Sequence, residues 1–223
     1  MTAPFPADGP VVLLGGTFDP VHFGHLRTAE EVRRTLGAER FLLVPSGEPP
    51  HRPTPRTPAA HRLAMAEAAV MDRPEAAVLG WEVAAEGPSY TVRMLEWLRE
   101  RLGNRSVSII VGSDAFTGLH QWHQWPRLLE LAHIVTVRRP GTGWTELESP
   151  LAEAVADRWT DDPAVLARSA AGAVLALEVT RLDISATAIR AGAGPAFLVP
   201  SNVEHYIDTH DLYRHREETA HDG

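Results

Sequence analysis

Short, continuous apolar runs alternate with helical segments along most of the chain, and this alternation restricts the possible fold more than any other feature. The apolar runs are 11–14, 41–44, 107–111, 133–137 and 174–179, with a weaker one at 77–83. Helical periodicity predicts helices over 25–36, 59–71, 91–102, 125–131 and 151–170. Strands buried on both faces read as continuous apolar runs, so the pattern predicts a parallel sheet covered by helices on both sides. We therefore expect a Rossmann-like, doubly wound α/β fold.

One domain is expected to span residues 11–214, because neither an internal repeat nor a low-complexity linker divides this range. Residues 1–10 and 215–223 are predicted to be flexible segments at its two ends. Near the second end, Ser201 and Glu204 have the Ser-x-x-Glu spacing of a capping box. This spacing predicts a small C-terminal helical extension to the sheet domain.

Composition excludes several classes of function. The 223 residues include no Cys, which rules out disulfides, thiolate zinc sites, iron–sulfur clusters and thiol nucleophiles. A formal net charge of −8 argues against a partner such as duplex nucleic acid, whose binding needs a dense field of Lys and Arg. The sequence contains no long apolar stretch and no signal-peptide pattern at its start. We therefore expect a cytoplasmic protein with no membrane partner that acts on small molecules.

The loop after the first apolar run is the first candidate site. It reads Gly-Gly-Thr-Phe-Asp-Pro-Val-His-Phe-Gly-His from Gly15 to His25. Glycines let the backbone turn sharply and let a ligand approach, and the start of a helix offers free amides to an anion. The loop has neither the Lys of a P-loop nor the Gly-x-Gly-x-x-Gly spacing of a dinucleotide site. It is therefore predicted to bind phosphate in another way.

Two histidines of this loop, His22 and His25, lie three residues apart and would face the same side of the start of a helix. Two imidazole donors over a triphosphate would stabilise charge that builds on oxygen as a phosphorus–oxygen bond breaks. Two alternatives remain open, a zinc site and a pair of structural histidines. Zinc sites on helices more often use an i, i+4 pair with a further ligand.

A second candidate site is the segment Ile-Ser-Ala-Thr-Ala-Ile-Arg from Ile184 to Arg190. A strand is expected to end near Asp183, and Ser185 and Thr187 are small hydroxyl residues that can cap the helix that follows. The Arg190 guanidinium offers a fork of donors that suits a phosphate group. An ordinary capped surface helix is the alternative interpretation of this segment.

Together, these two segments resemble the two signatures of the HIGH-motif nucleotidyltransferase superfamily, His-x-Gly-His and Ile-Ser-x-Thr-x-x-Arg. Further segments narrow the resemblance to the bacterial nicotinate-nucleotide adenylyltransferases: PSGEPPHR at 45–52, GPSYT at 87–91, Gly-Ser-Asp at 112–114 with Trp122, and RRPG at 138–141. The resemblance covers nearly the whole chain. It implies adenylyl transfer from ATP to nicotinate mononucleotide, which gives deamido-NAD and pyrophosphate in NAD biosynthesis.

The resemblance also implies roles for individual residues. His22, His25 and Arg190 would be catalytic. ATP would be bound by Gly15, Gly16, Thr17, Phe18, Gly112, Asp114, Ile184, Ser185, Thr187 and Arg190. Nicotinate mononucleotide would be bound by His51, Arg52, Tyr90, Thr91, Trp122, His123 and Arg139. Mg²⁺ would be carried by ATP, without a metal site made by the protein.

Two other functions stay open. The chain could transfer the adenylyl group to another acceptor, such as nicotinamide mononucleotide or phosphopantetheine, although the Pro-Pro-His and Ser-Tyr-Thr segments favour nicotinate. It could instead be a nucleotide-binding regulator that has lost catalysis. Loss of His22, His25 or Arg190 would mark such a regulator, and all three are present. The sequence indicates neither an oligomeric state nor a function for residues 144–173.

Overall fold

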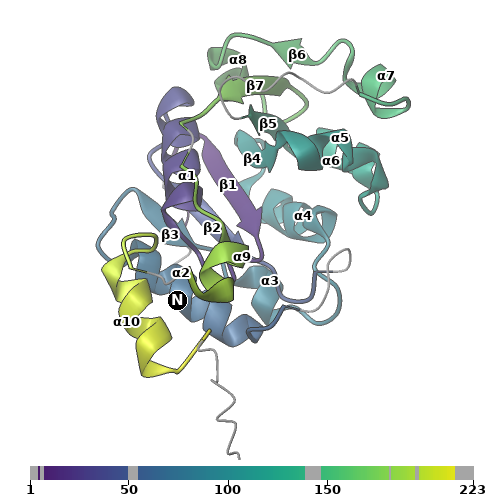
Figure 1. Cartoon of the computed structure of the whole chain (residues 1–223). Coiled ribbons are helices and arrows are strands. Elements are labelled where there is room, and N and C mark those ends of the chain that lie inside the picture. Colours follow the sequence, from purple (N-terminus) through teal and green to yellow (C-terminus); the bar gives the residue numbers. More distant parts are fainter. Residues whose placement is uncertain are drawn as a thin grey trace, which may run out of the picture.

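The computed structural model describes residues 5, 8–49, 55–138, 147–180, 182–193 and 196–213. Within these residues, seven parallel strands form one sheet in the order β3-β2-β1-β4-β5-β7-β6. The strands are β1 (Val11–Gly16), β2 (Phe41–Pro45), β3 (Ala76–Val78), β4 (Val107–Gly112), β5 (His133–Arg138), β6 (Trp159–Thr160) and β7 (Val174–Glu178). The predicted doubly wound α/β fold is confirmed (Figure 1).

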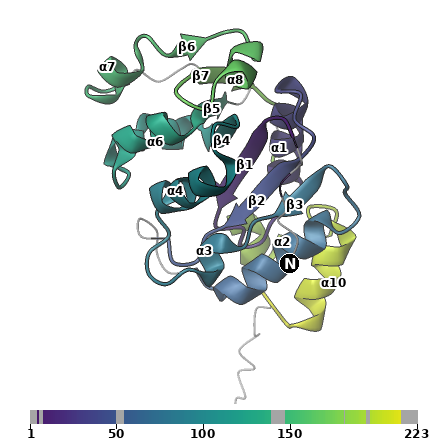
Figure 2. The ribbon, with the colours of Figure 1, turned by 180° about the vertical axis from the view of Figure 1, so that it is seen from behind.

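Helices cover both faces of the sheet. One hydrophobic cluster joins it to α1 (Phe23–Thr35), α2 (Ala59–Val70), α8 (Ala164–Arg168), η2 (Ile189–Ala193) and α10 (Ser201–Thr209). A second cluster joins the other face to α4 (Thr91–Leu102), α5 (Ser113–Thr117), η1 (Leu119–Gln121), α6 (Trp125–Leu131) and α7 (Leu151–Val155). The short helices α3 (Trp81–Ala84) and α9 (Ala186–Ala188) lie in loops at the carboxyl edge of the sheet. Figure 2 shows α10 beside α2, at the end of the molecule opposite α7.

The two clusters explain why the strands read as unbroken apolar runs. Successive side chains of a strand point to opposite faces, and in β1 the side chain of Val12 enters one cluster while those of Val11 and Leu13 enter the other. The side chains of Phe41 and Leu42 in β2 divide in the same way. A strand that is buried on both sides has no solvent face, so it shows no polar alternation.

The strand order places the loops that follow β1 and β4 side by side. β1 pairs with β2 on one side and with β4 on the other, so the chain reverses its direction of travel across the sheet at this point. In open α/β sheets, ligands bind in the crevice beyond the strand carboxyl ends at such a switch point. The loop from Gly15 to His25 begins at this crevice.

Two predicted elements differ from the structure. The strand expected over 77–83 ends at Val78, because the edge strand β3 pairs with β2 over only three residues, and α3 follows. The helix expected over 151–170 is instead α7, β6 and α8. Thr160 pairs with Leu175 of β7, and the Asp162 carboxylate accepts a bond from the Ala164 amide at the start of α8.

The capping box predicted at Ser201 and Glu204 is also absent, because Pro200 is the N-cap of α10 and Ser201 is already helical. The helical extension itself exists as α10. The flexible tail predicted for 215–223 lies outside the described residues, as do most of residues 1–10. None of the described helices combines the length and apolar character needed to cross a membrane.

Candidate active site

The loop between β1 and α1 is shaped by a buried aromatic ring. Phe18 adopts a positive φ of 51°, and its ring is buried beneath the loop. A Cβ atom on Gly16 would lie 2.9 Å from this ring, so only glycine fits there without displacing it. The Phe18 ring also meets the ring of His25 edge-on, with 5.0 Å between the centroids. The side chain of Phe18 therefore supports His25, which leaves its backbone for contact with a ligand.

His22 and His25 form a stacked pair at the start of α1. His22 is the N-cap residue, His25 lies three residues further on, and the ring centroids are 3.7 Å apart. The backbone N–H of His22 donates to Nδ1 of His25 at 3.2 Å. Because that bond requires an unprotonated Nδ1, the neutral His25 ring carries its hydrogen on Nε2. The fold thus fixes the tautomer of His25 and leaves its Nε2–H as a donor for a ligand.

Both imidazoles are uncharged near neutral pH. Burial lowers the pKa of His22 to about 4, and burial together with the neighbouring His22 lowers the pKa of His25 to about 3. Two charged rings would repel at this separation, so neutrality is also what allows them to stack. Nδ1 of His22 is buried and has no hydrogen-bond partner among the described residues.

The second signature segment lies against this loop, as the sequence predicts. Nη1 of Arg190 donates to the backbone oxygen of Asp19 at 2.6 Å, and Nη2 donates to Oγ1 of Thr187 at 3.1 Å. Ser185 is the N-cap residue of α9, but its side chain makes no capping bond, so the predicted cap is wrong. The strand before this segment ends at Glu178, earlier than the Asp183 that was expected.

Arg62 ties two loops of the site together from within the core. Its side chain is only 1% exposed, on the face of α2 that packs against the sheet. The guanidinium donates to the backbone oxygens of Thr17 at 2.8 Å, Ser46 at 2.6 Å, Gly47 at 2.8 Å and Thr57 at 3.1 Å. It therefore joins the β1–α1 loop to both ends of the loop between β2 and α2.

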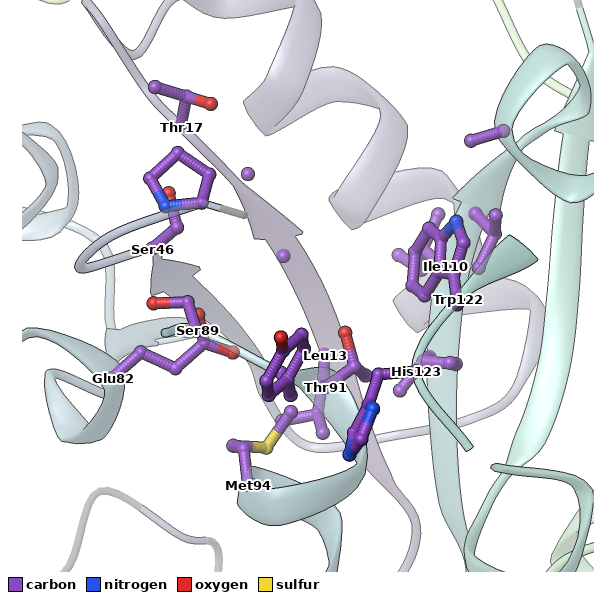
Figure 3. Close-up of a pocket in the computed structure, with 17 residues that line it drawn as sticks. Leu13, Thr17, Ser46, Glu82, Ser89, Thr91, Met94, Ile110, Trp122 and His123 are labelled. Atoms are coloured by element: carbon purple, nitrogen blue, oxygen red, sulfur yellow. The ribbon is translucent and has the colours of Figure 1, made fainter. Parts of the chain in front are cut away.

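A pocket of about 260 Å³ opens at the carboxyl ends of β1 and β4. It brings together two predicted groups, Gly15, Gly16 and Thr17 from the ATP set and Tyr90, Thr91, Trp122 and His123 from the acceptor set. In Figure 3, Trp122 lies beside Ile110 on one side of the pocket, and Glu82 lies with Ser46 and Ser89 on the other.

Aromatic side chains and free amides line the middle of this pocket. The rings of Tyr90 and His123 stack with centroids 4.2 Å apart. Tyr90 is the N-cap of α4 and makes no side-chain capping bond, so the first amides of the helix, which begins at Thr91, are left to solvent or a ligand. The combination suits a flat ring with an anionic substituent.

Not every predicted residue lines this pocket. Gly112 ends β4 and Asp114 lies in the first turn of α5, and both are exposed at the same edge of the sheet. His51, Arg52 and Arg139 lie outside the described residues, so their roles stay predictions.

Sequence reasoning missed Glu82, a carboxyl group that lines the pocket and is only 8% exposed. Burial raises its pKa to about 7, although a hydrogen bond with Ser89 opposes the rise. Ser89 Oγ also accepts the amides of Gly47 at 2.8 Å and Glu48 at 3.1 Å. The sequence signal that could have identified Glu82 is its position five residues before GPSYT. Because a strand was predicted over 77–83, Glu82 was treated as part of that strand. Arg62 was marked by its place among the apolar residues of α2.

The donors of this site are imidazoles, a guanidinium and backbone amides, which suit phosphate oxygens. Among the described residues, no group of three His, Asp or Glu side chains could hold a metal ion. This donor set fits a divalent ion that is bound by the phosphates of a nucleotide.

A doubly wound sheet with a histidine pair after its first strand and an Ile-Ser-x-Thr-x-x-Arg segment after β7 defines a nucleotidyltransferase. The chain belongs to the cytidylyltransferase-like family, whose model matches residues 13–192. Enzymes of this family generally use a divalent metal with ATP.

Curated relatives narrow the classification of the chain within this family. It is 45% identical over 208 residues to a protein of Acidithiobacillus ferrooxidans named as a nicotinate-nucleotide adenylyltransferase, covering 92% of this chain and 95% of that protein. A protein of the same name from Dechloromonas aromatica is 43% identical, covering 92% and 98%.

Solved structures support the fold. Plasmodium falciparum nicotinic acid mononucleotide adenylyltransferase, complexed with NaAD, aligns with a TM-score of 0.66 at 14% identity and covers 92% of this chain and 98% of that one. The same enzyme complexed with APC aligns with a TM-score of 0.64 at 13% identity, with the same coverage.

We expect Glu82→Gln to stabilise the protein above neutral pH. The pKa of Glu82 is near 7 when folded and near 4.5 when unfolded, so the wild type loses stability as pH rises from about 4.5 through 7. The free energy of unfolding of Glu82→Gln, relative to that of the wild type, should therefore be about 2 kcal/mol higher at pH 8.5 than at pH 5. Urea denaturation at the two pH values measures this difference.

Glu67→Gln on the exposed face of α2 is the matched control, and its effect should not change with pH. A Glu82→Gln effect of the same size at both pH values would contradict the assignment of a raised pKa to Glu82.

Proposed function

We propose that this chain transfers the adenylyl group of ATP to nicotinate mononucleotide, giving deamido-NAD and pyrophosphate in NAD biosynthesis. One observation carries the proposal: the neutral pair of His22 and His25 shares the β1–α1 loop with a pocket lined by Trp122 and the start of α4. Phosphate chemistry and recognition of an aromatic anion thus meet at one edge of the sheet. The names of the curated relatives support the same reaction.

The reaction is an in-line displacement at the α-phosphorus of ATP. The 5′-phosphate oxygen of nicotinate mononucleotide forms a bond to that phosphorus, and the bond from it to the bridging oxygen breaks, which releases pyrophosphate. No side chain acts as a nucleophile. The protein contributes position and electrostatic stabilisation, which are the main requirements of phosphoryl and nucleotidyl transfer. Mg²⁺ bound to the ATP phosphates supplies positive charge to the leaving group.

His25 stabilises the charge that develops on a phosphate oxygen through its Nε2–H, whose tautomer is fixed by the His22 backbone. His22 stacks on it, and burial keeps both rings neutral, so neither ring needs to gain or lose a proton. Arg190 binds the phosphates with the donors that its bonds to Asp19 and Thr187 leave available.

The family resemblance supports the remaining ATP contacts. Backbone amides from Gly15 to Phe18 approach the nucleotide, and Gly112 and Asp114 lie by its ribose and adenine. Ile184, Ser185 and Thr187 form the phosphate side of the site.

The acceptor binds on the aromatic side of the pocket. Trp122 stacks on the pyridine ring, and the amides at the start of α4 bind its carboxylate near Tyr90, Thr91 and His123. His51, Arg52 and Arg139, which lie outside the described residues, are proposed to bind the acceptor as well.

We expect His25→Ala to lower kcat by about 10²- to 10³-fold, because a donor that acts mainly in the transition state is lost. The KM values should change far less. Pyrophosphate release under saturating ATP and nicotinate mononucleotide measures the effect, and His205→Ala on the exposed side of α10 is the control. A His25→Ala enzyme within a few-fold of wild type would remove His25 from the mechanism.

We expect Trp122→Ala to raise KM for nicotinate mononucleotide by roughly 10- to 100-fold, equivalent to about 1 to 3 kcal/mol of lost stacking. KM for ATP should stay within about threefold, which serves as the internal control. Trp122→Phe keeps an aromatic face and should recover part of the loss. Equal changes in both KM values would make Trp122 a structural residue.

The choice of acceptor tests the proposed function itself. An amide in place of the carboxylate would turn an NH₂ group toward the donors of α4 and leave buried groups unpaired. We therefore expect kcat/KM for nicotinate mononucleotide to exceed that for nicotinamide mononucleotide by at least about tenfold. The assay is pyrophosphate release from ATP with each acceptor in turn, with phosphopantetheine as a third acceptor that should give none. A preference for either other acceptor, or nucleotide binding without turnover, would overturn the proposed function.

A further inference from the structure

The segment after α10 returns to the loop of the histidine pair. The hydroxyl group of Tyr213 donates to Oδ1 of Asp19 at 2.6 Å, although the two residues are 194 positions apart in the sequence. Asp19 is only 5% exposed, and Sδ of Met65 lies 3.9 Å from the same hydroxyl. The proposed reaction uses neither Tyr213 nor the Asp19 carboxylate, so the contact needs its own explanation.

The backbone around Tyr213 is strained. Asp211 and Tyr213 both have positive φ values, 51° and 62°, in a region that residues other than glycine rarely adopt. The amide of Leu212 bonds to the backbone oxygen of Ile207 at 3.0 Å, which turns the chain back after α10. Such conformations persist only where the surrounding contacts fix them. Here the result is that the phenol ring points inward to Asp19.

The Tyr213 hydroxyl is a permanent donor. Burial and the hydrogen bond with Asp19 raise the pKa of Tyr213 far above its usual value, so the group keeps its proton at neutral pH. The Asp19 carboxylate therefore has a fixed neutral donor in addition to the positive charge of Arg62 nearby.

Asp19 is held from two directions. Tyr213 binds its carboxylate, while Nη1 of Arg190 binds its backbone oxygen at 2.6 Å. A carboxylate that lost its donor would become a strong competitor for the Arg190 guanidinium, because a charged, bidentate pair is stronger than a bond to a carbonyl. Arg190 donors engaged by Asp19 would no longer be available to phosphate.

We propose that Tyr213 is a positioning residue for ATP, which holds the Asp19 carboxylate away from Arg190 and so keeps the Arg190 guanidinium available to the triphosphate. The proposal deepens the proposed function, on which its kinetic test rests. Its binding test does not depend on the acceptor.

The first experiment compares Tyr213→Phe with Tyr206→Phe. Both remove one phenol hydroxyl, but that of Tyr206 lies 2.9 Å from Nδ1 of His61 between α2 and α10, outside the site. Calorimetry with a non-hydrolysable ATP analogue should show Kd raised about tenfold or more by Tyr213→Phe, as expected when a charged group is mispaired, and unchanged by Tyr206→Phe. KM for ATP should rise in parallel, and KM for nicotinate mononucleotide should not.

A double-mutant cycle distinguishes a positioning role of Tyr213, which acts through the Asp19 carboxylate, from a general contribution of Tyr213 to stability. Asparagine at position 19 carries no charge and does not compete for Arg190, so Tyr213→Phe in the Asp19→Asn background should change Kd for the analogue by less than about threefold. Equal effects in both backgrounds, or a lower melting temperature with an unchanged Kd, would overturn the proposal.

Truncation gives an independent test if Tyr213→Phe does not fold. A chain that ends after Leu212 should lose affinity for the analogue as Tyr213→Phe does, and a chain that ends after Tyr213 should bind like the full chain. Equal affinity of the two truncated chains would overturn the proposal. Analogue binding by the wild type without pyrophosphate release from nicotinate mononucleotide would instead contradict the proposed function alone.

Discussion

A positive charge inside the hydrophobic core determines the shape of the site. The Arg62 guanidinium is out of contact with water, and a buried charge is tolerated only where its donors are bonded. Those bonds go to backbone oxygens of the two loops at the carboxyl edge of the sheet, and the charge of Asp19 partly offsets the desolvation that lowers the pKa of Arg62. The loops can move away from one another only by leaving this charge unpaired. Arg62 therefore fixes the spacing of two loops that contribute Thr17 and Ser46 to the lining of the pocket.

The histidine pair and Glu82 carry little formal charge before a substrate enters. Burial keeps His22 and His25 neutral, and the same effect holds Glu82 close to half-protonated near pH 7. Both substrates of the proposed reaction bring several negative charges of their own. Neutral imidazoles and backbone amides can lie close together without repelling one another, and each of these dipoles is already oriented. They add to the positive charge of Arg190 in stabilising such anions.

The parts of the structure that the sequence could predict are those determined by local pattern. α4 and α6 coincide with their predicted ranges, and every predicted strand exists, because periodicity and burial are visible over a few residues. The helix expected over 151–170 was wrong because pairing with β7, a tertiary contact, decides the state of Trp159. Asp19 and Tyr213 could not be paired from the sequence, since nothing local marks either as a partner of the other. Their link depends on a backbone turn after α10 that periodicity does not predict.

The contact between Tyr213 and Asp19 has a consequence for the order in which the protein matures. Ribosomes deliver the β1–α1 loop early, and the sheet can begin to form around it while the chain is still growing. The loop nevertheless receives its last tether only from a segment made 194 residues later. A chain that stops before Tyr213 would therefore contain both histidines and the Arg190 segment but lack the contact that holds the Asp19 carboxylate.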